Sequence, residues 1–224
     1  MRAEEFAAAR RRMLAEISAH AVQLRETIGR STFDQRVMTA MERVPRHEFV
    51  PIEFQGYAYA NIPVPIGFGK TISQPFIVAL MTDLLDIGPE DAVLEIGTGL
   101  GYQSAILAQL ARSVYSIEII EELGRQARQR LRRQGCANVE LKITNGYDGW
   151  SEHAPFDKVI VTAAPDLIPP PLIQQLKTGG KLVIPAGLPD AQTLILVEKP
   201  RNGGITTKEI LPVRFSQLES AEAA

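Results

Sequence analysis

The sequence predicts an α/β fold of the Rossmann-like, doubly wound type, with a mostly parallel sheet, a C-terminal antiparallel hairpin and an N-terminal helical extension. Two observations predict it. From Asp91 onward, short apolar runs alternate with amphipathic segments of helical period, as in strand–helix–strand units. The last two apolar runs, 181–187 and 192–200, are separated only by a short loop, which favours a hairpin. We therefore expect the sheet to begin near residue 92.

The composition is that of an ordinary globular protein. The chain has 224 residues, of which 45% are hydrophobic and 22% are charged, enough for one domain with a proper core. A formal net charge of −2 provides no general attraction for nucleic acid or for an anionic membrane. Cys136 is the only cysteine, so no disulfide can form within the chain. No apolar run approaches membrane-spanning length, and we expect a cytoplasmic protein.

The N-terminal part is predicted to be helical. Apolar residues recur at near-helical spacing from residue 3 to about 28, with Arg and Glu between them. A second helix is predicted over 31–44, with Ser31 or Thr32 as its N-cap and Pro45 as its end. The following stretch is rich in Pro, Gly and aromatic residues, which favours an ordered loop or short strands over a flexible linker.

The stretch "GFGKTISQPF", residues 67–76, gathers polar side chains in front of a predicted helix that Pro75 opens. Ser73 is well placed to cap this helix. It is also well placed to contact a ligand, because the N–H groups of a helix N-terminus attract a carboxylate. The two interpretations are compatible, and both stay open.

The core elements follow in order over 76–199. Each strand is a short apolar run, and each helix between the parallel strands carries its apolar residues at helical spacing. The predicted strands are 92–97, 113–119, 139–144, 158–164, 181–187 and 192–200, and the predicted helices are 76–85, 101–111, 121–135 and 170–180.

A glycine-rich turn, "VLEIGTGLGYQSA", is the strongest motif in the chain. Gly97, Gly99 and Gly101 stand between a predicted strand and a predicted helix, where glycine lets the backbone turn tightly and approach a ligand. The spacing is G-x-G-x-G, with Tyr102 where a dinucleotide loop of the G-x-G-x-x-G type would have its third glycine, and this disfavours an NAD-dependent oxidoreductase. Glu95, before the turn, suits a positively charged ligand and repels a pyrophosphate.

Glu118 ends the second strand, where an acidic side chain can accept hydrogen bonds from both ribose hydroxyls. Together with Glu95 and the glycines it favours a nucleoside cation, S-adenosylmethionine, over NAD or a nucleoside triphosphate. The adjacent Thr98 and Ile119 belong to the same predicted cofactor site. "GFGKT" lacks the strand–G-x-x-x-x-G-K arrangement of a phosphate-binding loop.

Asn145 and Gly146 follow the third strand and are candidates for contacts with the adenine, because an amide can both donate and accept. The alternative is a simple Asn-Gly turn.

Beyond these motifs, the sequence resembles the protein-L-isoaspartate O-methyltransferases from about Val44 to Leu218. The resemblance is carried by "RVPRHEFVP", "PIGFGKTISQP", "VLEIGTGLGYQSA", "APFDKVIVTAAP", "LKTGGKLVIPAG" and "PVRFSQL". It implies methylation of the α-carboxylate of L-isoaspartyl residues in damaged proteins and peptides, with S-adenosylmethionine as donor and S-adenosylhomocysteine as product. It further implies a single methyltransferase domain, with an extension over 1–75, a cofactor-binding core over 76–199 and a C-terminal strand and tail over 200–224.

The resemblance also assigns roles near the acceptor. It implies that Ser73 is the active-site serine and that Thr71 and Ile72 supply further hydrogen bonds beside the donor. Four weaker candidates for the walls of a peptide groove, for which ordinary core packing is an equal alternative, are Ile66, Phe68, Val213 and Ser216.

One residue departs from the family pattern, which often has Gly-Asp-Gly where this chain has Thr144-Asn145-Gly146. We expect altered donor affinity from it, without loss of function.

Other functions are less well supported. A carboxylate acceptor is already ionised and needs no general base, which agrees with the absence of a recognisable acid–base pair, triad or metal motif. Methyltransferases acting on amino groups in nucleic acids usually carry an Asn/Asp-Pro-Pro-aromatic motif after the fourth strand, where this chain reads "TAAPDL". Ser73 lacks a G-x-S-x-G elbow, which disfavours a hydrolase. A non-catalytic module that binds S-adenosylmethionine stays open. We expect a monomer whose partners are isoaspartyl proteins and peptides.

Overall fold

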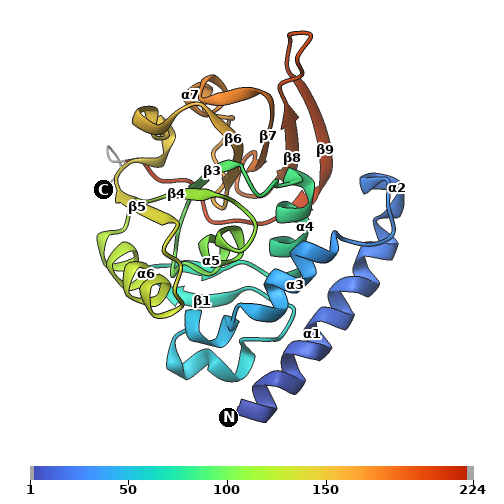
Figure 1. Cartoon of the computed structure of the whole chain (residues 1–224), viewed down its shortest axis with the longest axis vertical. Helices are drawn as coiled ribbons and strands as arrows, with labels where there is room; N and C mark the ends of the chain where they lie inside the picture. The colour runs from blue at the N-terminus through green and yellow to red at the C-terminus, as the bar shows by residue number, and fades with distance from the viewer. Residues whose placement is uncertain (1–2, 221–224) are drawn as a thin grey trace.

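The computed structural model describes residues 3–220, and its largest feature is a seven-stranded sheet (Figure 1). Its strands are β3 (Ala92–Ile96), β4 (Ser113–Glu118), β5 (Val139–Ile143), β6 (Phe156–Val161), β7 (Leu176–Ala186), β8 (Gln192–Glu198) and β9 (Thr206–Val213). Their order is β5-β4-β3-β6-β7-β8-β9. Neighbours from β5 to β7 are parallel, while β8 and β9 are antiparallel to their neighbours. The predicted fold class, including the C-terminal hairpin, is confirmed.

Alternate strand residues face two separate cores. Val93 of β3 belongs to the larger core, whereas Leu94 and Ile96 belong to the smaller one on the other face. The larger core includes residues of helices α1 (Ala3–Gln23), α3 (Gln35–Arg43), α4 (Pro75–Leu85), α5 (Tyr102–Ala108) and α6 (Glu121–Arg133). The smaller core includes Leu172 of α7 (Pro170–Gln174) and Trp150. Both faces of the central strands are thus buried, as in a doubly wound sheet.

The N-terminal helices differ in detail from the prediction. The helix expected over 3–28 is interrupted at Leu24, after which a short α2 (Arg25–Ile28) ends at Gly29 in the left-handed conformation. The expected N-cap at Ser31 or Thr32 is wrong. Asp34 is the N-cap of α3, and its carboxylate accepts a 2.7 Å hydrogen bond from the N–H of Arg36.

The segment before α4 is ordered, as predicted. Two 3₁₀ turns, η1 (Arg46–Phe49) and η2 (Ile52–Tyr57), lead into a two-stranded antiparallel hairpin, β1 (Val64–Gly67) and β2 (Lys70–Ile72). Phe68 lies at the hairpin tip with φ 54°. This hairpin brings the polar stretch 70–74 to the start of α4.

The helix predicted over 170–180 begins at Pro170 as expected but is shorter, because α7 ends at Gln174 and β7 begins at Leu176. Leu176 pairs with Phe156 of β6, so pairing with the sheet replaces the local helical preference. Among residues 3–220, no helix combines the length and the apolar character needed to cross a membrane.

Candidate active site

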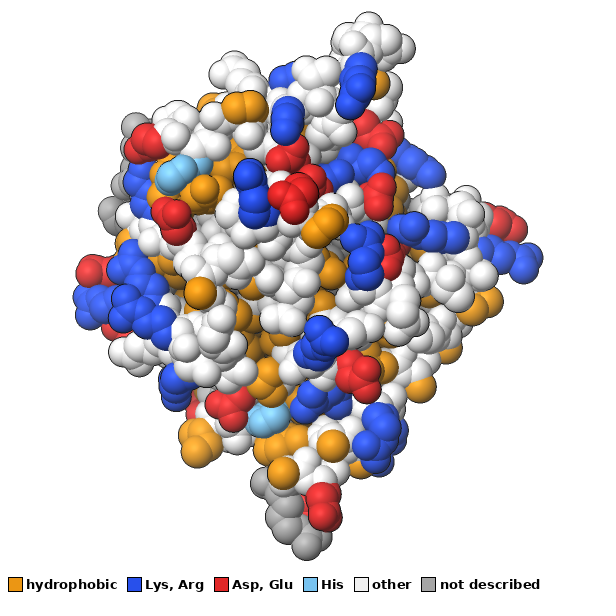
Figure 2. Space-filling view, in the orientation of Figure 1, with side chains coloured by type: hydrophobic (Ala, Val, Ile, Leu, Met, Phe, Trp, Pro, Cys, Tyr) orange, Lys and Arg blue, Asp and Glu red, His pale blue; other side chains and the backbone are white. Residues whose placement is uncertain are grey.

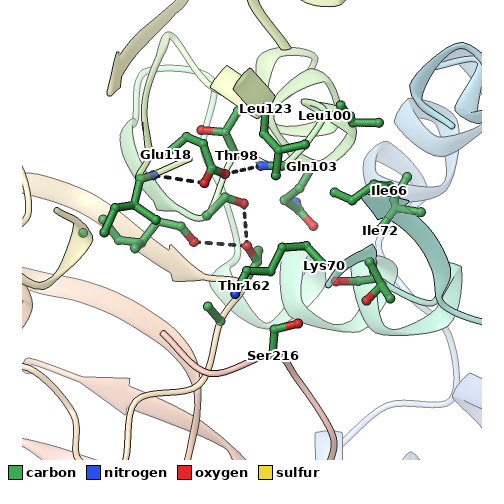
Figure 3. Close-up of a pocket in the computed structure, with 18 of the residues that line it drawn as sticks. Ile66, Lys70, Ile72, Thr98, Leu100, Gln103, Glu118, Leu123, Thr162 and Ser216 are labelled. Atoms are coloured by element: carbon green, nitrogen blue, oxygen red, sulfur yellow. Dashed lines mark hydrogen bonds between the residues drawn. The ribbon is translucent and has the colours of Figure 1, made fainter. Parts of the chain in front are cut away.

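The carboxyl ends of the parallel strands border a cavity, which we call the glycine-loop cavity. It contains about 850 Å³ of free space, its open mouth included. Its lining comes from the glycine turn, the hairpin β1–β2, the start of α4, the end of β4, Thr162 after β6 and the C-terminal segment 216–219. Glu118 and Gln103 face Lys70 and Ser216 across it (Figure 3). Parts of the chain that are far apart in sequence therefore meet at one site, at the strand ends where α/β proteins bind ligands.

Gly97 can only be glycine in this backbone. Its φ of 94° is left-handed, and a Cβ at this position would lie 2.5 Å from Oγ1 of Thr162. That oxygen is itself held, 2.6 Å from the carbonyl oxygen of Gly97. The turn after β3 is therefore fixed against the end of β6, which leaves its backbone open toward the cavity.

Glu118 is 5% exposed and holds the turn from the other side. Its Oε2 accepts a 2.7 Å hydrogen bond from the N–H of Gly99, and its Oε1 accepts from the N–H groups of Ile119 and Ile120 at 3.0 and 2.9 Å. Burial raises the pKa of Glu118, and these three N–H donors oppose the rise. A carboxylate offers about four acceptor sites, two on each oxygen, so Oε1 is fully used and Oε2 keeps one site for a ligand hydroxyl.

Glu95 lies beneath the turn and does not line the cavity. It is fully buried, and its Oε2 accepts hydrogen bonds from the hydroxyls of Ser104 and Ser116. Burial raises the pKa of Glu95 to about 7. This carboxylate therefore links α5 to β4 through the two serines. It does not reach the cavity, so the direct ligand contact expected from the sequence is not possible in this arrangement.

Gln103, which the sequence analysis missed, does face the cavity. Its Nε2 donates a 2.9 Å hydrogen bond to Thr82, while its buried Oε1 has no partner among the described residues. A buried acceptor left without a donor is costly. The available indication in the sequence was a polar residue two positions after the last glycine of the turn, on the predicted helix.

Ser73 does not cap α4. The N-cap is Gln74, which makes no side-chain cap bond, and the N–H of Phe76 is bound by Oδ1 of Asn61 at 3.0 Å. The hydroxyl of Ser73 makes no hydrogen bond to any residue in the range 3–220, and Ser73 lines the glycine-loop cavity. The capping alternative is therefore wrong, and the hydroxyl is available to a ligand.

The backbone of Ser73 is fixed by a buried cation that the sequence analysis did not single out. Nη2 of Arg46 donates a 2.7 Å hydrogen bond to the carbonyl of Ser73, and its Nε donates to Ala58 at 2.8 Å. The guanidinium lies 4.8 Å from the ring centroid of Tyr102. Burial lowers the pKa of Arg46 to about 10, so it stays charged at neutral pH. The available indication was an arginine flanked by apolar residues in the "RVPRHEFVP" stretch.

A second depression, which we call the β9 groove, adjoins the cavity. It contains about 1290 Å³ of free space, open mouth included, and its lining includes His20 of α1, the start of α4 and the segment 211–216. Four residues line both the groove and the cavity: Thr71, Ser73, Thr162 and Ser216. Two ligand spaces therefore meet at Ser73, and α1 reaches the groove through His20.

The remaining predicted residues divide clearly. Ile66, Ile72, Thr98, Ile119 and Gly146 line the glycine-loop cavity, and Val213 lines the β9 groove. Together with Glu95, three predicted residues line neither space: Phe68, Gly101 and Asn145. Phe68 is 58% exposed at the hairpin tip.

Asn145 forms a local turn instead of facing the cavity. Its Oδ1 accepts from the N–H of Tyr147 at 3.1 Å, and its Nδ2 donates to Asp148 at 3.2 Å. Gly146 lines the cavity close to β3, where a Cβ would lie 2.4 Å from Cγ2 of Ile96. Within residues 3–220, no three His, Cys, Asp or Glu side chains are grouped so that they could hold a metal ion.

Comparison with known proteins agrees with this geometry. The family model described as protein-L-isoaspartate(D-aspartate) O-methyltransferase matches residues 19–223. Protein-L-isoaspartate O-methyltransferase 1 of Polaromonas sp. strain JS666 is 65% identical over 218 residues, 97% of this chain and 92% of the relative. Protein-L-isoaspartate O-methyltransferase 2 of Syntrophobacter fumaroxidans is 56% identical over 216 residues, 96% of this chain and 87% of the relative.

Solved structures show the same fold. A protein-L-isoaspartate O-methyltransferase superposes with a TM-score of 0.80 at 25% identity, covering 94% of this chain and 66% of that one. A candidate protein-L-isoaspartate O-methyltransferase from Plasmodium falciparum, solved with S-adenosyl-L-homocysteine, gives a TM-score of 0.78 at 23% identity, covering 92% of this chain and 96% of that one. With a family model matched over most of its length and close relatives along almost all of it, this chain belongs to the protein-L-isoaspartate O-methyltransferase family.

Proposed function

We propose that this protein transfers the methyl group of S-adenosylmethionine to the α-carboxylate of L-isoaspartyl residues in damaged proteins and peptides, and releases S-adenosylhomocysteine. The observation that carries the proposal is the junction of the glycine-loop cavity with the β9 groove at Ser73, Thr71, Thr162 and Ser216. Direct transfer between two bound molecules needs such a junction, because the reacting atoms must be held in line.

The residues of the glycine-loop cavity fit the donor. The free acceptor site on Oε2 of Glu118 suits a ribose hydroxyl, and the unpaired Oε1 of Gln103 suits the ammonium of an amino acid. When bound, S-adenosylmethionine supplies a methyl group on a positively charged sulfur. Gly97, Gly99 and Gly146 leave backbone next to it without side-chain bulk.

The remaining chemistry asks the protein to position and to desolvate. An α-carboxylate with a pKa of about 3.5 is ionised at neutral pH and can attack without a general base. We assign Ser73 the role of orienting that carboxylate through its free hydroxyl, on a backbone that Arg46 holds. Val213 and Ser216 form part of the groove wall, and Ile66 and Ile72 shield the junction from water.

We propose further that the whole chain acts as one domain and as a monomer in the cytoplasm. Strand β9 extends the sheet of the core, and α1 packs on α4, so neither end of the chain forms a separate unit. Acidic and basic side chains are interspersed on the face in Figure 2, and the net charge is −2, which disfavours nucleic acid as a partner.

The test uses methyl-labelled S-adenosylmethionine and two peptides that differ only in isoaspartate or aspartate at one position. Base-labile label on the isoaspartyl peptide alone supports both the acceptor and the ester linkage. Label on neither peptide, with donor binding intact in a calorimetric titration, contradicts the acceptor and favours a non-catalytic binding module. Label on both peptides contradicts the selectivity for damaged residues.

A further inference from the structure

The β9 groove carries an uneven charge. Among residues 3–220, Arg214 is the only lysine or arginine that lines it, and no aspartate or glutamate lines it. Its other lining residues are His20 and uncharged side chains. Glu16, the carboxylate bonded to Asn61 near His20, lies outside the lining. In the part of the chain that the structure describes, the groove that meets Ser73 therefore presents one strong cation and no anion to its occupant.

The charge of Arg214 is not paired with any residue among 3–220. Arg214 is exposed, and its guanidinium forms no ion pair and no hydrogen bond with any residue in the described part of the chain. Arginine usually pairs with a carboxylate or phosphate, because its fork of N–H groups matches two oxygens. A cation without an internal partner, at the rim of a ligand groove, is thus available to a ligand.

The backbone on either side of this cation is rigidly held. The side-chain amide of Gln192, which is 3% exposed, makes two hydrogen bonds to the backbone of Phe215. Its Oε1 accepts from the N–H of Phe215 at 2.6 Å, and its Nε2 donates to the carbonyl oxygen of Phe215 at 3.1 Å. The next residue, Ser216, accepts a 2.9 Å hydrogen bond from Ala164 through its carbonyl. Arg214 therefore projects from a fixed segment that also carries Ser216 to the junction.

The position of Arg214 separates it from the methyl transfer itself. The junction residues line both spaces, whereas Arg214 lines only the groove. A ligand atom at Arg214 is consequently away from the carboxylate that reacts beside Ser73. The anion that Arg214 receives belongs to another part of the same peptide.

We propose that Arg214 forms a subsite for an acidic side chain close to the isoaspartyl residue, so that the enzyme selects damaged segments that carry aspartate or glutamate near the lesion. This inference rests on the proposed function. An exposed ion pair contributes modestly, and we expect a preference of roughly twofold to fivefold in kcat/KM for acidic over neutral neighbours. Salt weakens the preference, because the site is open to solvent.

The test compares isoaspartyl peptides that are identical except for Glu, Gln or Lys at positions flanking the lesion. The variants are Arg214→Gln, Arg214→Glu and, as a matched control, Arg201→Gln. Arg201 is exposed in the turn between β8 and β9, at the opposite end of β9 from Arg214, and its substitution changes net charge equally. The measured quantity is the ratio of kcat/KM for the Glu peptide to that for the Gln peptide.

The ratio is expected to fall to about one in Arg214→Gln and to stay at the wild-type value in Arg201→Gln. In Arg214→Glu it should fall below one, and the Lys peptide should become the preferred substrate. A wild-type ratio of one overturns the proposal, and so does an equal loss for all peptides in Arg214→Gln, which would place the reacting carboxylate at Arg214. Methylation of the Gln peptide tests the proposed function separately. If no peptide is methylated, the same ratios are read from calorimetric binding of the peptides.

Discussion

Substituting Gly97 by alanine tests the geometry of the glycine turn most directly. The new Cβ would lie 2.5 Å from Oγ1 of Thr162 and would sit on a residue with φ 94°. The left-handed backbone costs a non-glycine residue about 1–2 kcal/mol. Overpacking costs a further 1–3 kcal/mol or so. Rotating Thr162 away from the new Cβ would not remove the cost of this contact, because its Oγ1 would then lose the hydrogen bond to the carbonyl of Gly97.

Gly135 provides a matched control. It also has a left-handed φ, 70°, but a Cβ there would meet nothing within 4 Å. Gly135→Ala therefore carries the backbone strain alone. The difference in unfolding free energy between the two variants isolates the contact with Thr162, and we expect it to be about 1–3 kcal/mol.

The assay is denaturant unfolding followed by the fluorescence of Trp150, the only tryptophan, which is 8% exposed in the folded protein. Calorimetric titration with S-adenosylhomocysteine measures the second effect: Gly97→Ala should weaken donor binding at least tenfold, or about 1.4 kcal/mol. Gly135→Ala should leave donor affinity unchanged, since Gly135 lies outside the lining of the cavity. Equal destabilisation by both substitutions, with equal donor affinity, would refute the reasoning.

Three further predictions follow from single side chains. Ser73→Ala should lower turnover at least tenfold while unfolding free energy stays within about 0.5 kcal/mol, because its hydroxyl bonds no described residue. Asn61→Ala removes the hydrogen bond to the N–H of Phe76 and should instead lower the unfolding free energy by about 1 kcal/mol. Unchanged turnover in Ser73→Ala would contradict the assigned role. Burial raises the pKa of Glu95 from 4.5 to about 7, so the folded state retains this proton to higher pH than the unfolded state. The associated stability is present below about pH 4.5 and is lost as pH rises through about 7. The Glu95→Gln variant should therefore lose roughly 3 kcal/mol less unfolding free energy than wild type as the pH rises through this window. Identical pH profiles of unfolding free energy for wild type and variant would exclude this. Gln103→Leu should weaken donor binding about tenfold in a calorimetric titration, because it removes the unpaired acceptor of the cavity; an unchanged dissociation constant would contradict that contact.

The glycine turn and Glu118 could be predicted because their geometry is local. Left-handed turn positions favour glycine, and an acidic residue at the end of a parallel strand necessarily lies at the edge of the sheet where ligands bind. Gly97 and Gly99 have φ values of 94° and 56°, and both line the cavity together with Glu118.

The direction of the Glu95 side chain could not be predicted from the local sequence. Glu95 lies on β3, where all five residues are buried. In a half-exposed strand the alternation of polar and apolar residues shows which way each side chain points, but a strand covered on both faces lacks this alternation. Only the packing of Ser104 and Ser116 around its carboxylate decides that Glu95 points beneath the turn.

By itself, the sequence determined the succession of strands and helices along the chain, the glycine turn and the family, because each depends on residues close together in the chain. The tertiary structure alone decided that Asn61 rather than Ser73 satisfies the start of α4, that Arg46 holds Ser73, and that Arg214 borders the groove without a partner among residues 3–220. These assignments depend on which distant groups satisfy each donor and acceptor. Buried polar groups take partners from wherever the folded chain brings them, and sequence spacing does not record that choice.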